Sequence, residues 1–142
     1  MNKNSFLIEL SESENTDHGR IDFAVQNELQ KVFSAIWELE SQVNNGGFDQ
    51  YFSNSDWDIV AYAPTALRTI GADSCARVVE RAIKAVTPLT ITPEGISKAL
   101  EQARDRLEAL DSEFYEYPDD LTELLHAFVN KHPEAFDRRP KN

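Results

Sequence analysis

A long amphipathic segment that runs into two adjacent glycines is the feature that most limits what this chain can fold into. Over residues 20–44, apolar residues recur at spacings of three or four, which keeps them on one face of a helix. They are Ile21, Val25, Leu29, Val32, Ile36, Leu39 and Val43. Gly46 or Gly47 can take the left-handed conformation that ends a helix without a Cβ clash. We therefore predict a helix over 20–44 and a short helical turn over 48–52.

The remaining segments are also helical in period, and caps and prolines delimit them. Asp56 or Asp58 is the predicted cap of a helix that reaches Ile70, and Pro64 is expected to kink or split that helix. Asp73 or Ser74 is the predicted cap of the next helix. Thr92-Pro93 begins a helix that buries residues up to Leu110, and Asp119 or Asp120 caps a last helix, which Pro133 interrupts. Only residues 89–91 resemble a strand. The sequence thus predicts an all-α fold, a single compact multi-helix domain of about five to seven helices.

Length and composition favour one globular domain. A chain of 142 residues with 41% hydrophobic residues can bury a sizeable core. We expect an N-terminal arm over residues 1–19, in which Phe6, Leu7 and Ile8 are candidates to dock, a helical domain over 20–137, and a basic tail over 138–142. The single cysteine suits a reducing compartment, and no apolar run approaches the ~20 residues that span a bilayer. A cytoplasmic protein without membrane contact is expected.

The net charge of the chain limits which kinds of partner it can bind. Acidic residues outnumber basic ones 25 to 14, which gives a net charge of −11. Phosphate binding requires Lys and Arg, so direct binding of nucleic acid is not expected, whereas a basic protein would be attracted. The acids are concentrated: residues 107–123 hold seven acids and no base. These seven, the candidate partner-binding residues, are Glu108, Asp111, Glu113, Glu116, Asp119, Asp120 and Glu123. An ordinary solvated acidic face is the alternative interpretation.

No recognisable catalytic set is present. Cys75 is the only thiol, and its position fits the inner face of a helix. The histidines, His18, His126 and His132, lack the spacing of a zinc site, and Glu123 with His126 gives only one of the two pairs that a di-iron bundle needs. A glycine-rich phosphate loop and a serine nucleophile elbow are also missing. We therefore expect that the protein is not an enzyme and binds neither a metal nor a cofactor.

Amide side chains gather around the double glycine. Asn44, Asn45, Gln50 and Asn54, together with Tyr51, could bind a peptide or a small polar ligand. Alternatively, they satisfy backbone groups where a helix ends, a role for which Asn is well suited. The sequence is compatible with both interpretations, ligand binding and a structural role.

The same region carries a family resemblance. Glu38-Leu39-Glu40, Asn44-Asn45-Gly46-Gly47-Phe48, and then Gln50-Tyr51-Phe52 resemble the DNA-mimic-protein-like family of small bacterial helical proteins, much of which is otherwise a domain of unknown function. The family motif comprises Asn44, Asn45, Gly46, Gly47, Phe48 and Gln50. The resemblance implies an all-α fold without enzymatic activity. One characterised type in this family is an acidic dimer that occupies the DNA-binding surface of a transcription factor, which makes a homodimer and a role in transcription regulation expectations here.

Three functions follow as hypotheses. The first is a non-enzymatic acidic protein that binds a basic or DNA-binding protein as a DNA mimic. The second is an immunity or regulatory interaction module that uses residues 44–54. The third, less favoured, is a small hydrolase with an amide and carboxylate pocket beside Asn45, Gln50 and Tyr51.

Overall fold

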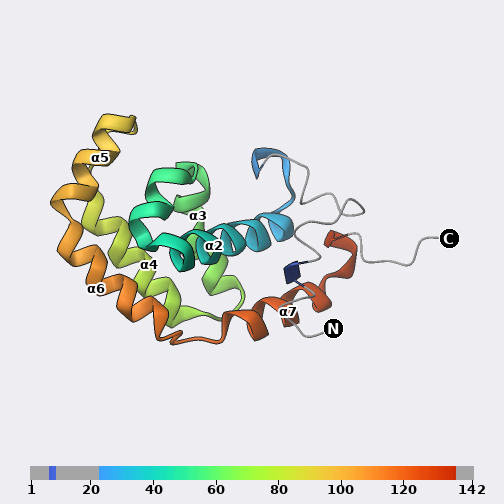
Figure 1. Cartoon of the computed structure of the whole chain (residues 1–142). Helices are drawn as coiled ribbons and strands as arrows, with labels where there is room; N and C mark the ends of the chain where they lie inside the picture. Colours follow the sequence, from blue (N-terminus) through green and yellow to red (C-terminus); the bar gives the residue numbers. More distant parts are fainter. Residues whose placement is uncertain (1–6, 9–22, 137–142) are drawn as a thin grey trace.

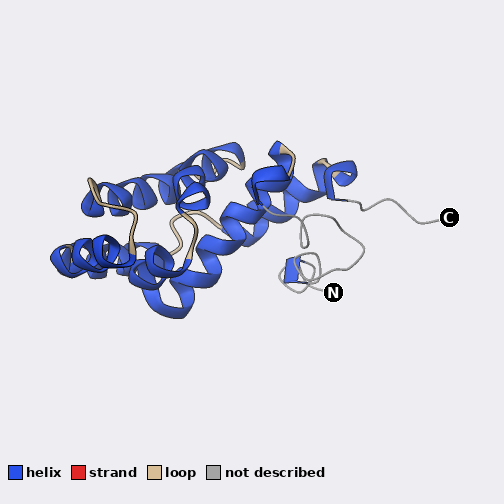
Figure 2. Ribbon diagram, turned by 90° about the horizontal axis from the view of Figure 1, so that it is seen from above, coloured by secondary structure: helices blue, strands red, loops and turns tan. Residues whose placement is uncertain are grey.

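The computed structural model describes residues 7–8 and 23–136 (Figure 1). Besides a helical segment at residues 7–8, it contains η1 (Phe23–Val25), α2 (Glu28–Asn54), α3 (Trp57–Thr69), α4 (Asp73–Val86), α5 (Pro93–Gln102), α6 (Arg104–Tyr115), α7 (Leu121–Lys131) and η2 (Pro133–Phe136). Over those residues every regular element is a helix, so the all-α prediction is confirmed (Figure 2). Most of the predicted arm, His18 and the basic tail lie outside the described residues.

Helix α2 begins later than predicted. Residues 23–25 form a 3₁₀ helix, and Asn27 caps α2: its side chain accepts from the N–H of Gln30 at 2.8 Å. The side chain of Gln30 accepts in return from the N–H of Asn27 at 3.1 Å. This reciprocal capping box satisfies two backbone donors, which fixes the helix start. The predicted start near residue 20 is therefore wrong.

The double glycine interrupts α2 at a kink, with one helical stretch before it and another after it. Gly46 and Gly47 leave helical geometry as predicted, and Gly47 has a φ of 74°. Helical geometry resumes at Phe48 and continues to Asn54, which confirms the helical turn predicted over 48–52. Gly47 is needed here because a Cβ strains this left-handed backbone.

Helix α3 has the predicted bounds, with Asp56 at its N-cap position and Ile70 at its C-cap, although the Asp56 side chain makes no cap hydrogen bond. Pro64 is buried inside α3, which stays one helix rather than splitting. Helix α4 begins at Asp73, with Ala72 at the cap position and no cap from its own sequence. The predicted cap by Asp73 or Ser74 is therefore wrong, because Asp73 is already helical. The carboxylate that caps α4 belongs to Asp119, 44 positions later than Cys75 in the chain.

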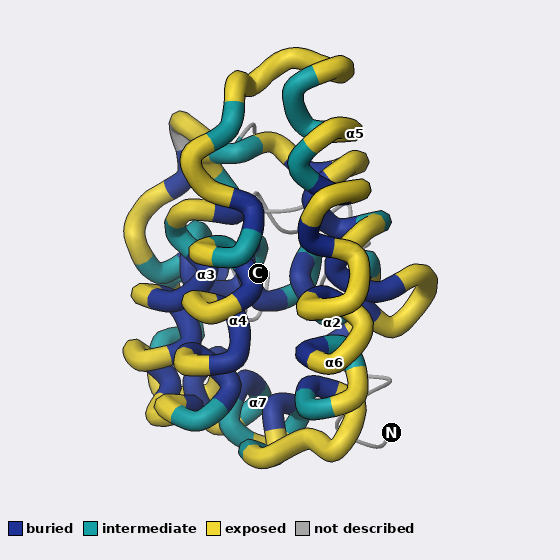
Figure 3. The backbone as a smooth tube through the Cα atoms, turned by 90° about the vertical axis from the view of Figure 1, so that its left-hand side faces the viewer, coloured by how far each residue is buried: buried dark blue, intermediate teal, exposed yellow. Residues whose placement is uncertain are grey.

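The segment predicted to run as one helix from Pro93 to Leu110 is two helices. Ala103 breaks it, with φ −98° and ψ 4°. Helix α6 packs against α2 and α4, whereas α5 projects from the body and is exposed over most of its length (Figures 1 and 3). The predicted cap at Thr92 is confirmed by its hydrogen bond from the N–H of Gly95 at 3.0 Å. The interruption at Pro133 is confirmed as well.

The core lies around α2, which contacts α3, α5, α6 and η2. Aromatic contacts link both halves of α2 to later parts of the chain: Phe33 contacts Phe136, and Phe48 contacts Phe114. Cys75 is fully buried, as predicted for a structural cysteine, and Leu7 is buried too, which confirms docking for that residue. In the described ranges, no helix has the length and hydrophobicity that crossing a membrane requires.

Candidate interaction surface

Helix α6, the loop that leads to α7 and the first turn of α7 carry the seven candidate partner-binding acids. The helix lies between α2 and α4, so its side chains point to two different flanks. Asp111 faces the kink of α2, while Glu113 faces α4. The structure therefore does not place the seven residues on one uniform face, and each must be described by its contacts.

Asp111 contacts the kink directly. Its Oδ1 accepts a hydrogen bond from the backbone N–H of Phe48 at 2.8 Å. This N–H belongs to the first residue after the glycines, where the restarting helix has unsatisfied donors. A carboxylate at this place also interacts favourably with the helix dipole. Asp111 is thus part of the fold as well as of the charged surface.

Asp119 and Asp120 cap two different helices. Asp119 Oδ2 accepts from the N–H of Cys75 at 2.8 Å and so supplies the cap that α4 lacks in its own sequence. Asp120 Oδ1 accepts from the N–H of Glu123 at 3.1 Å, which confirms the predicted cap of α7. Asp111, Asp119 and Asp120 therefore each accept a hydrogen bond at the start of a helical stretch. The sequence predicted this role only for Asp119 or Asp120, and only at the start of α7.

Glu113 is neutralised by a base. Its Oε1 lies 2.7 Å from Nη1 of Arg81 on α4. Both side chains are largely exposed, and such surface pairs add little stability. The pair does remove one negative charge from the flank that faces α4.

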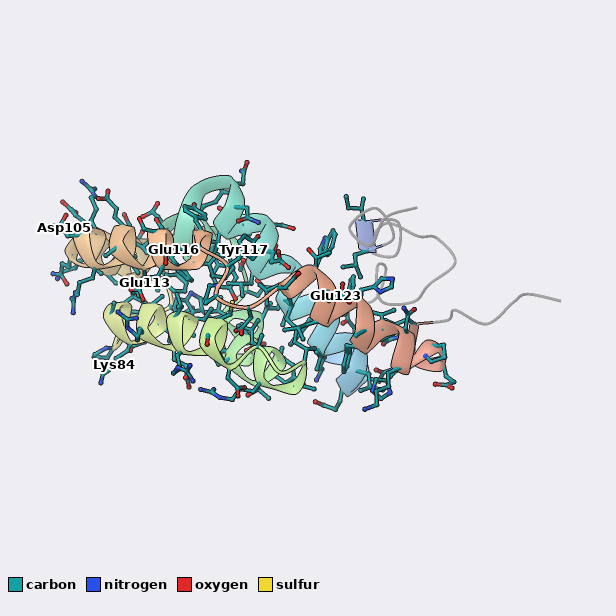
Figure 4. All side chains as sticks on the ribbon, turned by 90° about the horizontal axis from the view of Figure 1, so that it is seen from below. Lys84, Asp105, Glu113, Glu116, Tyr117 and Glu123 are labelled. Carbon is teal, nitrogen blue, oxygen red and sulfur yellow. The ribbon has the colours of Figure 1, made fainter. Side chains whose placement is uncertain are left out.

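Glu108, Glu116 and Glu123 are exposed. Figure 4 shows Glu113 on α6, Glu116 directly after that helix and Glu123 further along, on α7, with Lys84 on the neighbouring helix α4. Together with the capping aspartates, these residues extend the negative charge from α6 into α7. We name Glu108, Asp111, Glu116, Asp120 and Glu123 the acidic strip.

Acids from α2 join the acidic strip. Burial raises the pKa of the Asp111 carboxyl; the Phe48 N–H opposes this, and the negative charges of Glu108 and Asp49 raise the pKa further. Burial also raises the pKa of Glu40, with a further contribution from Asp120. Carboxylates from residues 40–49 and from residues 108–120 thus lie close enough to repel one another. The negative surface is built from two distant parts of the chain.

The motif amides bond to one another and to the helix. Asn45 donates to Oε1 of Gln50 at 3.1 Å, Gln50 donates to Oε1 of Gln42 at 2.8 Å, and Gln42 donates to Oε1 of Glu38 at 3.2 Å. Tyr51 is fully buried. Mutual hydrogen bonding across the kink is what a structural role requires.

A tyrosine bridge holds the loop after α6 against α2, and the sequence reasoning missed it. The Tyr117 hydroxyl donates to Oε2 of Glu40 at 3.0 Å and accepts from Asn44 at 2.7 Å. Tyr115 donates its hydroxyl proton to the carbonyl oxygen of Val43 at 2.7 Å. Tyr117 has a positive φ of 49°, and burial raises its pKa to about 12. No local pattern marks these contacts, because they join residues more than 70 positions apart.

The groups with potential for catalysis lie apart. Burial raises the pKa of the Cys75 thiol to about 12, so this thiol is protonated at neutral pH. His126 contacts Asn130, and His132 packs on the ring of Phe128. Within the described residues, no group of three His, Cys, Asp or Glu side chains could hold a metal ion.

Comparison with known proteins identifies the family. A sequence model described as DMP19-like protein matches residues 26–132, which span α2 to α7 and include the motif and the acidic strip. No curated protein and no solved structure matches the chain. Since the match covers most of the sequence and agrees with the helical fold, the chain belongs to the DMP19-like protein family.

Proposed function

We propose that this protein acts without catalysis, in the cytoplasm, as an acidic binding protein that occupies the DNA-binding surface of a basic partner. The observation that carries the proposal is that carboxylates of α2 interact electrostatically with those of α6 and of the start of α7: the charge of Asp49 raises the pKa of Asp111, and the charge of Asp120 raises that of Glu40. Membership of the DMP19-like family supports the same function. A transcription regulator is the class of partner that fits best.

The spacing of the charges supports mimicry of a phosphate row. Duplex DNA carries about one charge per 1.7 Å of axis, or one per ~3.4 Å of each strand. Side chains three or four residues apart on a helix are about 5–6 Å apart at Cβ. Glu108 and Asp111 have this spacing on α6, and Asp120 at the N-cap of α7 adds a further carboxylate ahead of Glu123. The acidic strip therefore presents a coarser row of the same sign.

Competition with DNA tests the proposal. Transcription regulators captured from the native cell are mixed with this protein and with their operator DNA over a series of salt concentrations. We expect the protein and the DNA to exclude each other, and the affinity to fall as salt rises. A complex that contains regulator, operator DNA and this protein at one site would overturn the proposal.

Charge variants make the test specific. Glu108→Gln with Glu116→Gln removes two exposed charges from the acidic strip, and Glu94→Gln with Glu134→Gln removes two exposed charges elsewhere. We expect the first pair to weaken binding to the regulator by tenfold or more, and the matched pair by much less. Equal losses would mean that total charge, rather than the acidic strip, determines binding.

A further inference from the structure

A groove between α4 and α6 has a positive rim, although the protein has a net charge of −11. Its cavity volume is about 350 Å³. The lining residues are Arg81, Lys84, Ala85, Arg106, Ala109 and Leu110. The groove thus lies on the flank of α6 that faces α4, whereas Asp111, in the acidic strip, faces α2.

Two matching sets of residues form the groove. Arg81, Lys84 and Ala85 on α4 have the spacing i, i+3, i+4, and Arg106, Ala109 and Leu110 repeat it on α6. Such residues share one side of a helix. Because alanine has no side chain beyond Cβ, the space between the two helices stays open there. Leu110, which is only 5% exposed, forms an apolar floor.

Two of the three cations on the rim, Lys84 and Arg106, have no acidic partner within the described chain. Glu113 pairs with Arg81 at 2.7 Å. Across residues 7–8 and 23–136, no carboxylate comes within 4.0 Å of Lys84 or Arg106. Two cations on neighbouring helices above an apolar floor create a local positive potential in a protein that has an excess of acids. This is complementary to a group that combines negative charge with an apolar side chain.

The openness of the groove indicates what kind of ligand it fits. Lys84, Arg106 and Ala109 are all exposed. Sites for small molecules bury most of the ligand surface, which an open groove of this size cannot do. An apolar side chain that belongs to a larger partner can use the groove as an anchor, because the rest of the partner covers the rim.

We propose that this groove docks an acidic segment of a partner protein. One aliphatic or aromatic side chain of the segment lies between Ala85 and Ala109, and flanking carboxylates pair with Lys84 and Arg106. The groove is a second interaction surface, opposite in charge to the acidic strip. The two surfaces can be disabled separately, since they share no residue.

Two synthetic helical peptides, rich in Glu and Ala and labelled with a dye, are the probes. They differ only in a central Leu or Ser, and fluorescence anisotropy with the full-length protein measures their binding. We expect the Leu peptide to bind about tenfold more tightly, because the groove buries its side chain. No difference between the two peptides, or no binding of either, would overturn the proposal.

Three variants locate the binding. Ala109→Leu fills the groove from an exposed helical position where Leu is well tolerated, and we expect it to remove the preference for the Leu peptide. Arg106→Glu should weaken both peptides about tenfold or more. Lys98→Glu on α5 makes the same change in net charge outside the groove and should change binding less than twofold. Circular dichroism checks that each variant is folded.

Several outcomes would contradict this assignment. If Lys98→Glu weakens binding as much as Arg106→Glu does, net charge and not the groove determines affinity. If Ala109→Leu leaves the preference for Leu intact, the side chain binds elsewhere. If sedimentation shows that Ala109→Leu abolishes self-association while neither peptide binds the wild type, a second copy of this chain occupies the groove and the proposal is wrong.

Discussion

Asp111 Oδ1 accepts a hydrogen bond from the backbone N–H of Phe48 at 2.8 Å, across 63 positions of sequence. The contact is possible because Gly47 stands beside it without a side chain: a Cβ at Gly47 would lie 2.5 Å from Oδ2 of Asp111. The glycine and the aspartate therefore form one structural unit. The family motif, which contains Gly47 and Phe48, depends on an acid in a different helix.

Gly47→Ala is expected to destabilise the protein more than Gly71→Ala. Both glycines have a positive φ, 74° and 88°, so alanine costs about 1–2 kcal/mol of backbone strain at either position. Only at Gly47 does the new Cβ also meet a neighbour, whereas nothing lies within 4 Å at Gly71. Urea unfolding of the two variants measures the difference.

A double-mutant cycle tests the cause of that difference. In an Asp111→Ala background the clash is gone, and the additional cost of Gly47→Ala over Gly71→Ala should largely disappear. Asp111→Ala alone should cost about 1 kcal/mol, because it removes the acceptor for the N–H of Phe48. If the two substitutions are additive, the steric explanation is wrong.

The caps show what the sequence could and could not reveal. Thr92 and Asp120 cap the helices that directly follow them, and local rules predicted both. Asn27 with Gln30 is an equally local signal, so the sequence itself marks the start of α2. Asp119, by contrast, caps a helix 44 positions earlier in the chain, and no local pattern can show such a contact.

The acidic surface, like the caps, could be predicted from the sequence only in part. The excess of acids over residues 107–123 is a property of sequence, so it was predictable, as was burial of Val32, Ile36, Leu39 and Val43 in the helical stripe. Which of those acids hold the fold and which face solvent depends on how α6 lies between α2 and α4. The break at Ala103, which involves neither Gly nor Pro, sets the direction of α6 and had no local signal.

Asp119→Ala should destabilise α4 even though the substitution lies outside that helix. It removes the acceptor for the N–H of Cys75, at a cost of about 1–2 kcal/mol. Asp119→Asn keeps a side-chain oxygen and should cost less. Hydrogen exchange of the amides at the start of α4 measures the local effect. Unchanged exchange at Cys75 in Asp119→Ala would show that the cap contributes nothing.

Cys75 should resist thiol reagents in the native protein. Its side chain is fully buried, and burial raises its pKa to about 12, so that at pH 8 only about one thiol in ten thousand is a thiolate. Labelling with iodoacetamide should be slow in buffer and fast in denaturing urea. Rapid labelling in buffer would show that α4 opens readily or that the thiol is accessible.

Glu40→Gln should stabilise the folded protein at pH 7, and the gain should shrink as the pH falls. Burial is the main cause that raises the pKa of Glu40 above its ordinary value of 4.5, and the nearby charge of Asp120 adds to it. The folded state therefore binds this proton more tightly than the unfolded state does, and ionisation of Glu40 weakens the fold as the pH rises from 4.5 through the raised pKa. Glutamine removes that ionisation and keeps an oxygen for the Tyr117 hydroxyl.

Unfolding in urea at pH 7 and at pH 4.5 measures the gain, which is the difference between the variant and the wild type. Glu101→Gln, at an exposed position on α5, is the matched control, and a surface substitution of this kind should change the stability little. Comparing variants in this way cancels the titration of the other carboxylates, which the two proteins share. A gain for Glu40→Gln that grows as the pH falls would mean that the hydrogen bond from Tyr117 outweighs burial, so that the ionised carboxylate stabilises the junction between α2 and the loop after α6.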